Sequence, residues 1–473
     1  MSSVVIVEHH EEKIMTQQLQ TPDKNQKFSF QPGKKTLTAI EKTFRSNLES
    51  NYTEKIEELE KSFNYQKNSD RYWSEPEQSI LYGTPLYEAA SASQKIALNH
   101  LNWFLSYNNI AASETEGITY NQVTASVFTA IGGYETISEE LDLETEQERS
   151  HIHAFHKIGF LTTKTLLGKD AFKAPLKGKS YKLKKKGDSQ HFYLNWKNLP
   201  FTDYRDNTLR FIAQKMLSGS KQYYSQYLRE LEHKSQSIPG SAGGFFGRGL
   251  APDSRLRFFT FNWGGSPFMA CQYYALRYIA NMTLKNIEFT IYKYFKKLEK
   301  KGEFIPTPTA ISYYHLLDEA FHTTTSLFLG RDLYNEFSKP TAYEKFIANW
   351  TMYLTQKNFH NGISGASPVL MSKDSFSTMD FVYKILKSPV FGMSQKDALH
   401  WMQQCFTQEH EGFHMALKYH QTLLSNIRRF CEDVDYLWPV NREMRLMAAA
   451  GSIEKALQAN RKTFEQFSRL VTN

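Results

Sequence analysis

Apolar residues recur at helical spacing in several long segments of the chain. In residues 91–131 the recurring positions are Leu98, Leu101, Leu105, Ala112, Thr119, Val123 and Val127. Similar stripes follow in residues 141–160, 266–300 and 311–328, and further helical patterns run from Pro340 onwards. Repeats of this kind are typical of amphipathic α-helices, and strand-like alternation is sparse. We therefore predict an all-α protein.

Each of the four stripes carries a glutamate where an apolar residue is expected. These glutamates are Glu116, Glu148, Glu288 and Glu319. In the fourth stripe, which contains YYHLLDEAFH, spacings of four and three residues place His315, Glu319 and His322 on one helix face. Buried carboxylates and imidazoles are costly without partners, so we expect these side chains to converge.

The spacing of these groups matches a carboxylate-bridged dimetal site. In such bundles two helices each supply a glutamate, and two others each supply a Glu-x-x-His pair. The interval from Glu116 to the pair at Glu148 nearly equals the interval from Glu288 to the pair at Glu319, and each suits one helical hairpin. Carboxylates can bridge two cations and imidazoles add nitrogen ligands. The sequence therefore predicts a ferritin-like helical bundle with a dimetal centre, with Glu114 left open as the alternative to Glu116.

His315 adds a third imidazole to the second half of this site. The pattern HxxxExxH, which follows Glu288 by the length of one hairpin, resembles the p-aminobenzoate N-oxygenase family of ferritin-like di-iron enzymes. This resemblance covers roughly residues 85–335 and implies the metal ligands Glu116, Glu148, His151, Glu288, His315, Glu319 and His322. The family usually has an aspartate before each Glu-x-x-His glutamate, where it supports a ligand histidine. Asp318 keeps this arrangement, whereas Gln147 departs from it.

The size, insertion and extended C-terminal part look more like the dimetal-carboxylate halogenases of the cylindrocyclophane type. That resemblance implies chlorination of an unactivated aliphatic C–H position on a fatty acyl chain bound to an acyl carrier protein, in natural-product biosynthesis. It also implies two transition-metal ions, with iron favoured and manganese left open, O2 and halide as co-substrates, and an external electron donor. Arylamine N-oxygenation and a non-catalytic metal-binding role remain alternatives, since the ligand pattern does not separate them.

A further Glu-x-x-His pair, Glu411 with His414, follows Asp380 at the same interval that separates Glu288 from Glu319. A six-ligand site that combines Asp380, Glu411 and His414 with Glu288, Glu319 and His322 is therefore an alternative. We disfavour it because it abandons the first hairpin and leaves His315 unused. We expect Glu411 and His414 to lie on a polar helix face.

Changes in composition along the chain predict its organisation. Residues 1–36 are polar and are expected to form a mobile tail before a single domain, 37–473. The bundle core is assigned to 91–160 and 266–335, the insertion to 161–255, and additional helices to 340–473. A surface helix is expected over 42–63, and a helix is expected around 205–233 within the insertion. The glycine-rich loop near Gly243 lacks both GxGxxG and GxxxxGK[ST], so we interpret it as a surface loop.

Charge and composition narrow the functional classes. The chain of 473 residues has a net charge of +8, and residues 164–187 hold nine lysines against one aspartate. This segment is either a solvated loop or a docking surface for an acidic carrier protein, and no nucleic-acid-binding motif accompanies it. We find neither a run of about 20 apolar residues nor a secretory signal, and the three cysteines are widely spaced. We expect a cytoplasmic protein without a membrane span, and a homodimer stays open.

Overall fold

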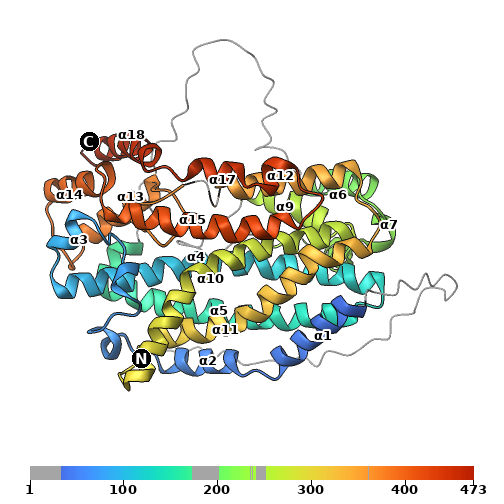
Figure 1. Cartoon of the computed structure of the whole chain (residues 1–473), viewed down its shortest axis with the longest axis horizontal. Helices are drawn as coiled ribbons and strands as arrows, with labels where there is room; N and C mark the ends of the chain where they lie inside the picture. The colour runs from blue at the N-terminus through green and yellow to red at the C-terminus, as the bar shows by residue number, and fades with distance from the viewer. Residues whose placement is uncertain are drawn as a thin grey trace, which may run out of the picture.

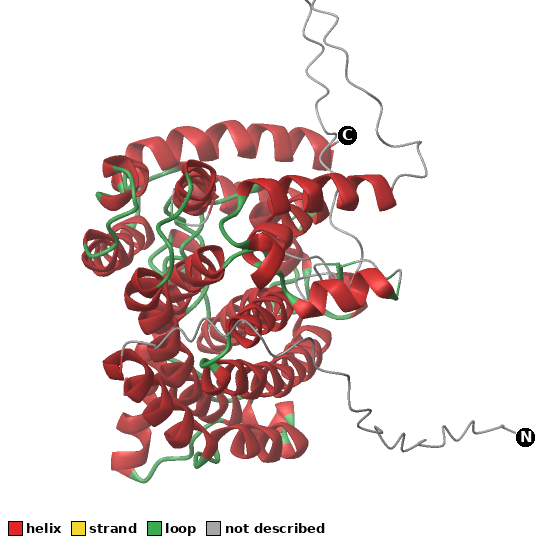
Figure 2. Cartoon of the chain, turned by 90° about the vertical axis from the view of Figure 1, so that its right-hand side faces the viewer, coloured by secondary structure: helices red, strands yellow, loops and turns green. Residues whose placement is uncertain are grey.

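The computed structural model describes residues 34–172, 202–234, 236, 238–240, 252–358, 360 and 362–472. Within these ranges the regular structure consists of helices, and no strand is formed (Figure 2). The prediction of an all-α, ferritin-like bundle is confirmed. Among the described residues, no helix combines the length and apolar character needed to cross a bilayer.

Two long helical hairpins form the centre of the molecule (Figure 1). In the first, α4 (Ala92–Ile131) packs along α5 (Glu135–Leu167), and in the second α10 (Pro267–Lys301) packs along α11 (Thr307–Leu327). Ser91 and Gln94 form a capping box at the start of α4. Gly132 (φ 75°) and Gly302 (φ 64°) end α4 and α10 in conformations that favour glycine, so the chain reverses within a few residues.

Two N-terminal helices cover one side of the bundle. Helices α1 (Lys34–Leu48) and α2 (Tyr52–Ser62) both pack against α5 and α11 (Figure 1). Residues 34–36, which the sequence assigned to the tail, are the first residues of α1. The expected single surface helix over 42–63 is corrected, because the chain leaves the helical conformation at Asn51 (φ −127°) before α2 starts. Both helices bring polar side chains to the site.

The C-terminal part forms a layer on the other side of the bundle (Figure 1). Its helices are α12 (Ala342–Asn358), α13 (Phe376–Lys387), α14 (Gln395–Thr407), α15 (Glu411–Glu432), α16 (Pro439–Arg442), α17 (Arg445–Ala450) and α18 (Ile453–Thr472). Of these, α15 and α12 contact α10, while α18 packs on α13 and α14.

The insertion contributes shorter helices. They are α6 (Thr202–Met216), α7 (Ser220–Tyr223), α8 (Gln226–His233) and α9 (Asp253–Trp263). The helix expected around 205–233 is thus divided, because Gly219 adopts a left-handed conformation (φ 68°). The lysine run beyond Phe172 and the glycine-rich loop at 241–251 lie outside the described residues.

Short elements complete the described chain. They are α3 (Pro85–Ala89), the 3-10 turns Tyr65–Asn68, Pro76–Gln78, Lys169–Phe172 and Leu333–Glu336, and a π-helical turn at Phe328–Asp332 directly after α11.

Candidate metal centre

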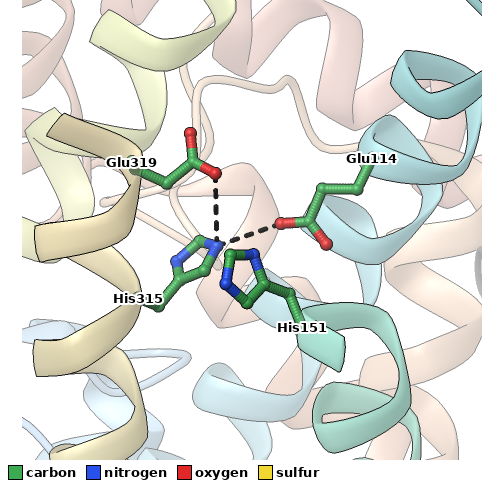
Figure 3. A group of neighbouring side chains, drawn as sticks. All are labelled: Glu114, His151, His315 and Glu319. Atoms are coloured by element: carbon green, nitrogen blue, oxygen red, sulfur yellow. Dashed lines mark hydrogen bonds and ion pairs between the residues drawn. The ribbon is translucent and has the colours of Figure 1, made fainter. Parts of the chain in front are cut away.

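Carboxylates and imidazoles from three bundle helices converge between the two hairpins. Glu114, His151, His315 and Glu319 each place a ligand atom within 4.8 Å of the others. Figure 3 shows that these four side chains point toward one another. A second group consists of Glu148, Glu319 and His322 under the same limit. Glu319 belongs to both groups, so the two sets of ligand atoms adjoin each other.

Helical spacing explains how the sequence builds these groups. Within α5 and α11, each Glu-x-x-His pair lies one turn apart on the face turned toward the opposite hairpin. His315 precedes Glu319 by a further turn on the same face of α11, and α4 supplies Glu114. All of these side chains are buried, with Glu114 the most exposed at 7%. Water is therefore largely excluded from the site.

The distances show which atoms face one another. His315 Nε2 lies 3.0 Å from Glu114 Oε1 and 3.7 Å from Glu319 Oε1. His322 Nδ1 lies 2.8 Å from Glu319 Oε1 and 3.4 Å from Glu148 Oε1. The carboxylates therefore surround one nitrogen of each imidazole.

The other ring nitrogens are held from behind. His151 Nε2 donates to Asp318 Oδ2 at 3.2 Å, and Asp318 also accepts from the Thr53 hydroxyl on α2 at 2.7 Å. His322 Nε2 donates to Gln147 Oε1 at 3.0 Å, and the Gln147 amide is paired with Asn47 on α1. Such contacts fix the tautomer and orientation of a histidine ligand.

Glu288, the ligand predicted on α10, contacts the cluster through His315. Its Oε1 accepts from His315 Nδ1 at 2.8 Å and from the Tyr107 hydroxyl at 2.5 Å. Glu288 therefore lies outside both converging groups and supports His315 from behind, as Asp318 supports His151. Its second oxygen, Oε2, is buried without a hydrogen-bond partner.

The first glutamate of the predicted ligand set has two candidates on α4, Glu114 and Glu116. Glu114, which the sequence left open, lies in the cluster, whereas Glu116 is only half-buried and belongs to neither group. Two residues along a helix point to different faces, so both cannot reach the site. Residues 97–104 are all buried around the full circumference of α4, which explains why the apolar stripe did not mark the face turned toward the site.

Several buried charges near the cluster were not predicted as functional. Arg277 on α10 forms an ion pair with Glu144 and donates to Glu148 Oε1 at 3.1 Å. Glu140 accepts from the Thr325 hydroxyl at 3.1 Å and from Asn47. One sequence signal was available, because Glu140, Glu144 and Glu148 follow one another at four-residue spacing on a single helix face.

The carboxylates around the three imidazoles favour the protonated form of each ring. Burial opposes the charge on His151, but hydrogen bonds to Asp318 and Glu148 raise its pKa to about 9. Burial and repulsion by Glu148 raise the pKa of Glu114 to about 7. For Glu148 itself, burial alone would raise the pKa, but hydrogen bonds with His151 and His322 hold it well below its usual range.

Unsatisfied buried atoms show that the residues fit a metal ion. Glu114 Oε2 is buried and has no hydrogen-bond partner, and the buried atoms Glu148 Oε2 and His151 Nδ1 face each other only at 3.5 Å. Such groups are costly in a protein interior unless a partner is supplied. Hard carboxylate oxygens together with imidazole nitrogens form a donor set suited to transition-metal ions. The cluster could therefore hold metal ions.

The alternative six-ligand set is not brought together among the described residues. Asp380 on α13 is paired with Lys384 at 3.1 Å, and His414 on α15 is paired with Glu409 at 3.0 Å at the surface. Neither belongs to a converging carboxylate–imidazole group in the described part of the chain. Glu411 and His414 lie in the C-terminal layer, on the exposed side of α15.

A helical bundle with a buried carboxylate–histidine cluster defines a candidate metalloenzyme of the ferritin-like type. Residues 35–468 match the family described as acyl halogenase CylC-like, and the chain belongs to this family. The expected relationship to the cylindrocyclophane-type halogenases is confirmed, and membership marks the protein as an enzyme that halogenates an acyl substrate. Neither the curated proteins nor the solved structures include a significant match to the chain.

Proposed function

We propose that the protein chlorinates an unactivated aliphatic carbon of a fatty acyl chain bound to an acyl carrier protein. The observation that carries this proposal is the buried cluster of carboxylates and imidazoles in a member of the acyl halogenase family. The oxidant is O2, the halogen comes from halide, and an external donor supplies electrons. Arylamine N-oxygenation is the competing activity for such ligands, and the family match favours an acyl substrate over an arylamine.

The two groups of ligands would each hold one metal ion, with iron as the proposed metal. Glu114, His151 and His315 would serve one ion, and Glu148 with His322 the other. Glu319 belongs to both groups and is the candidate bridging carboxylate. When bound, the ions supply the activation of O2 that removes hydrogen from an unactivated carbon.

The protein itself orients the histidine ligands, offsets the charge of the carboxylates and excludes water. Asp318, Gln147 and Glu288 each hold one ring nitrogen of a histidine, so the other nitrogen faces the carboxylates. Arg277 offsets part of the negative charge by pairing with Glu144 and Glu148. The burial of the cluster excludes bulk water, which would otherwise compete with halide and substrate.

A groove on the outer face of α10 supports a carrier-bound substrate. Its volume is about 630 Å³, and it lies between α10 and α15. Its apolar lining residues include Met282, Phe289 and Met415, and its lysines are Lys285, Lys293 and Lys418. Glu75 and Glu77 also line it. Lysines beside an apolar groove suit an acidic protein that delivers an acyl chain. Glu288 lies on the same helix as the groove residues but faces His315 on α11 and Tyr107 on α4.

The test compares two substrates under identical conditions. Protein reconstituted with iron is given O2, chloride and a reductant, together with either a fatty acyl carrier protein or a free arylamine. We expect mass spectrometry to show one chlorine on the acyl chain, and Glu319→Gln to abolish it. Oxidation of the arylamine with no chlorinated acyl product would overturn the proposal.

Carrier docking has its own matched test. Lys285→Glu with Lys293→Glu reverses charge inside the groove, whereas Lys300→Glu with Lys301→Glu makes the same change at the exposed end of α10. We expect the groove variant to raise KM for the acyl carrier protein several-fold, and the control to leave it nearly unchanged. Equal effects of the two variants would show that the groove does not receive the carrier.

A further inference from the structure

A row of aromatic rings leads away from the candidate metal centre. It begins at Tyr107 on α4, whose hydroxyl donates to Glu288 Oε1 at 2.5 Å. The Tyr107 ring stacks on Trp103, with ring centroids 4.3 Å apart and planes inclined by 23°. Trp103 meets Trp73 edge to face at 5.8 Å, and Trp73 meets Tyr65 at 5.9 Å. Each ring therefore touches the next without an intervening aliphatic side chain.

The rings are buried and rigidly held. Trp73 is fully buried, and Tyr65, the most exposed of the four, is 9% exposed. The indole N–H of Trp103 donates to Ser312 Oγ, and that of Trp73 donates to the Asn68 carbonyl, both at 2.9 Å. Fixed aromatic contacts of this kind give strong electronic coupling between neighbouring rings, which loosely packed side chains do not.

Both terminal tyrosines have a proton acceptor. A phenol loses its proton when it loses an electron, so oxidation of a buried tyrosine requires a base within hydrogen-bond distance. Glu288 serves Tyr107, while the Tyr65 hydroxyl lies 3.1 Å from His100 Nδ1. His100 Nε2 donates to the Arg71 carbonyl at 2.7 Å, which leaves Nδ1 free to accept.

The outer end of the row lies near solvent. Tyr65 begins a short 3-10 turn whose next residues, Gln66 and Lys67, are exposed. Arg71, whose carbonyl holds His100, is also exposed. The row thus links the buried centre to the protein surface.

We propose that Tyr107, Trp103, Trp73 and Tyr65 form an electron-transfer chain. It carries electrons from the protein surface to the centre when oxidising equivalents arise at the centre without a bound acyl substrate. The source of those equivalents rests on the proposed function, whereas conduction along the rings does not depend on it. The chain would protect the ligand histidines from oxidation during unproductive turnover.

The electrons and protons balance along the row. Tyr107 gives one electron to the oxidant at the centre and its proton to Glu288. Trp103 then reduces Tyr107, which takes its proton back, and Trp73 reduces Trp103. Tyr65 reduces Trp73 and gives its proton to His100 Nδ1. A soluble one-electron reductant of the thiol or ascorbate class restores Tyr65, so that one electron has moved inward and the four residues are unchanged.

Conduction can be measured with an external oxidant. The three native cysteines are buried, so a ruthenium photosensitiser can be attached selectively at Gln66→Cys in the full-length protein. Tyr65→Phe removes the first tyrosine, so transfer along the row after a laser flash passes through both tryptophans and ends in a tyrosyl radical at Tyr107. Transient absorption distinguishes tyrosyl from tryptophanyl radicals.

We expect a tyrosyl signal in the Tyr65→Phe protein that is lost when Tyr107→Phe is added. Adding Trp103→Phe should also remove it while leaving the tryptophanyl signal of Trp73. Trp263→Phe, which alters a buried tryptophan outside the row, should leave the signal unchanged. A tyrosyl signal that survives Tyr107→Phe or Trp103→Phe would overturn the proposal.

The protective role has a separate readout. Iron-loaded protein is cycled with O2 and ascorbate without acyl substrate, and oxidised residues are mapped by peptide mass spectrometry. We expect Trp73→Phe to accumulate several-fold more oxidation at Trp103, Tyr107 and the ligand histidines than the parent protein. The same oxidation pattern in both proteins would contradict protection, while chlorination of the acyl substrate would still be open to its own assay.

Discussion

Gln147 Oε1 lies 3.0 Å from His322 Nε2, in the place that Asp318 Oδ2 takes beside His151 in the other half of the site. Each half of the site therefore holds a histidine through one hydrogen bond, to an amide oxygen in one half and to a carboxylate oxygen in the other. An amide oxygen carries no full charge, so it stabilises the imidazole less strongly than a carboxylate does. Asn47 on α1 pairs with the Gln147 amide and fixes which atom faces the histidine.

Gln147→Ala should weaken metal binding. The substitution leaves His322 Nε2 without its acceptor, and loss of such a support typically lowers metal affinity about 10–100-fold. The measurement is an iron titration of metal-free protein, with Gln66→Ala at an exposed position as the control. An unchanged affinity would show that Gln147 does not orient the ligand.

Glu114 and Glu116 form a matched pair on one helix. Glu114→Ala should lower the metal content of reconstituted protein and abolish chlorination, because it removes a carboxylate from the cluster. Glu116→Ala should retain both, since Glu116 lies outside the two groups. Metal analysis of the two purified variants decides the assignment, and the opposite result would restore Glu116 as the ligand.

Arg277→Leu should destabilise the fold. It leaves Glu144 and Glu148 buried without their cation, and breaking a buried pair in this way costs about 3–5 kcal/mol. Urea denaturation measures the loss, and adding Glu144→Gln should recover part of it. Lys297→Met breaks a surface pair with Glu75 and should cost much less. A loss for Arg277→Leu no larger than for Lys297→Met would contradict this role.

Stabilisation by metal should grow with pH. The raised pKa of His151, about 9 against 6.5, adds stability below the ordinary value that is lost as pH rises through about 9. The raised pKa of Glu114, about 7 against 4.5, penalises the fold increasingly as pH rises from 4.5 through 7. Both pKa shifts therefore lower the stability of the metal-free protein as pH rises.

Metal ions bind the deprotonated ligands and offset this penalty. The difference in Tm between metal-loaded and metal-free protein should therefore widen from about pH 6 to about pH 9. Thermal unfolding of both forms across this range is the measurement. A difference that narrows as pH rises would mean that the cluster is not where the metal binds.

Long periodic stripes made most of the fold predictable. The helix predicted over 266–300 corresponds to α10, Pro267–Lys301, because its caps, Ser266 and Gly302, are local features. The division between α1 and α2 and the break at Gly219 were missed, since helix-forming residues continue on both sides of each. The local sequence therefore predicted the existence of these helices better than the residues at which they end.

Only part of the site could be predicted from the sequence. Glu-x-x-His spacing marked His151, Glu319 and His322, because helical geometry alone brings such pairs to one face. The same spacing at Glu411 and His414 carries no cluster in the described structure, because spacing does not say which hairpins face each other. Contacts between distant segments, such as Asn47 with Gln147, depend on tertiary packing and leave no local pattern.

The metal content of the purified, iron-reconstituted protein tests the central claim most directly. Two groups of ligands that share Glu319 predict about two transition-metal ions per chain, and Glu319→Ala should hold fewer than about one. Elemental analysis against protein concentration gives both values. Fewer than about one ion per chain in the parent protein, or an unchanged content in Glu319→Ala, would contradict a dimetal centre at this site.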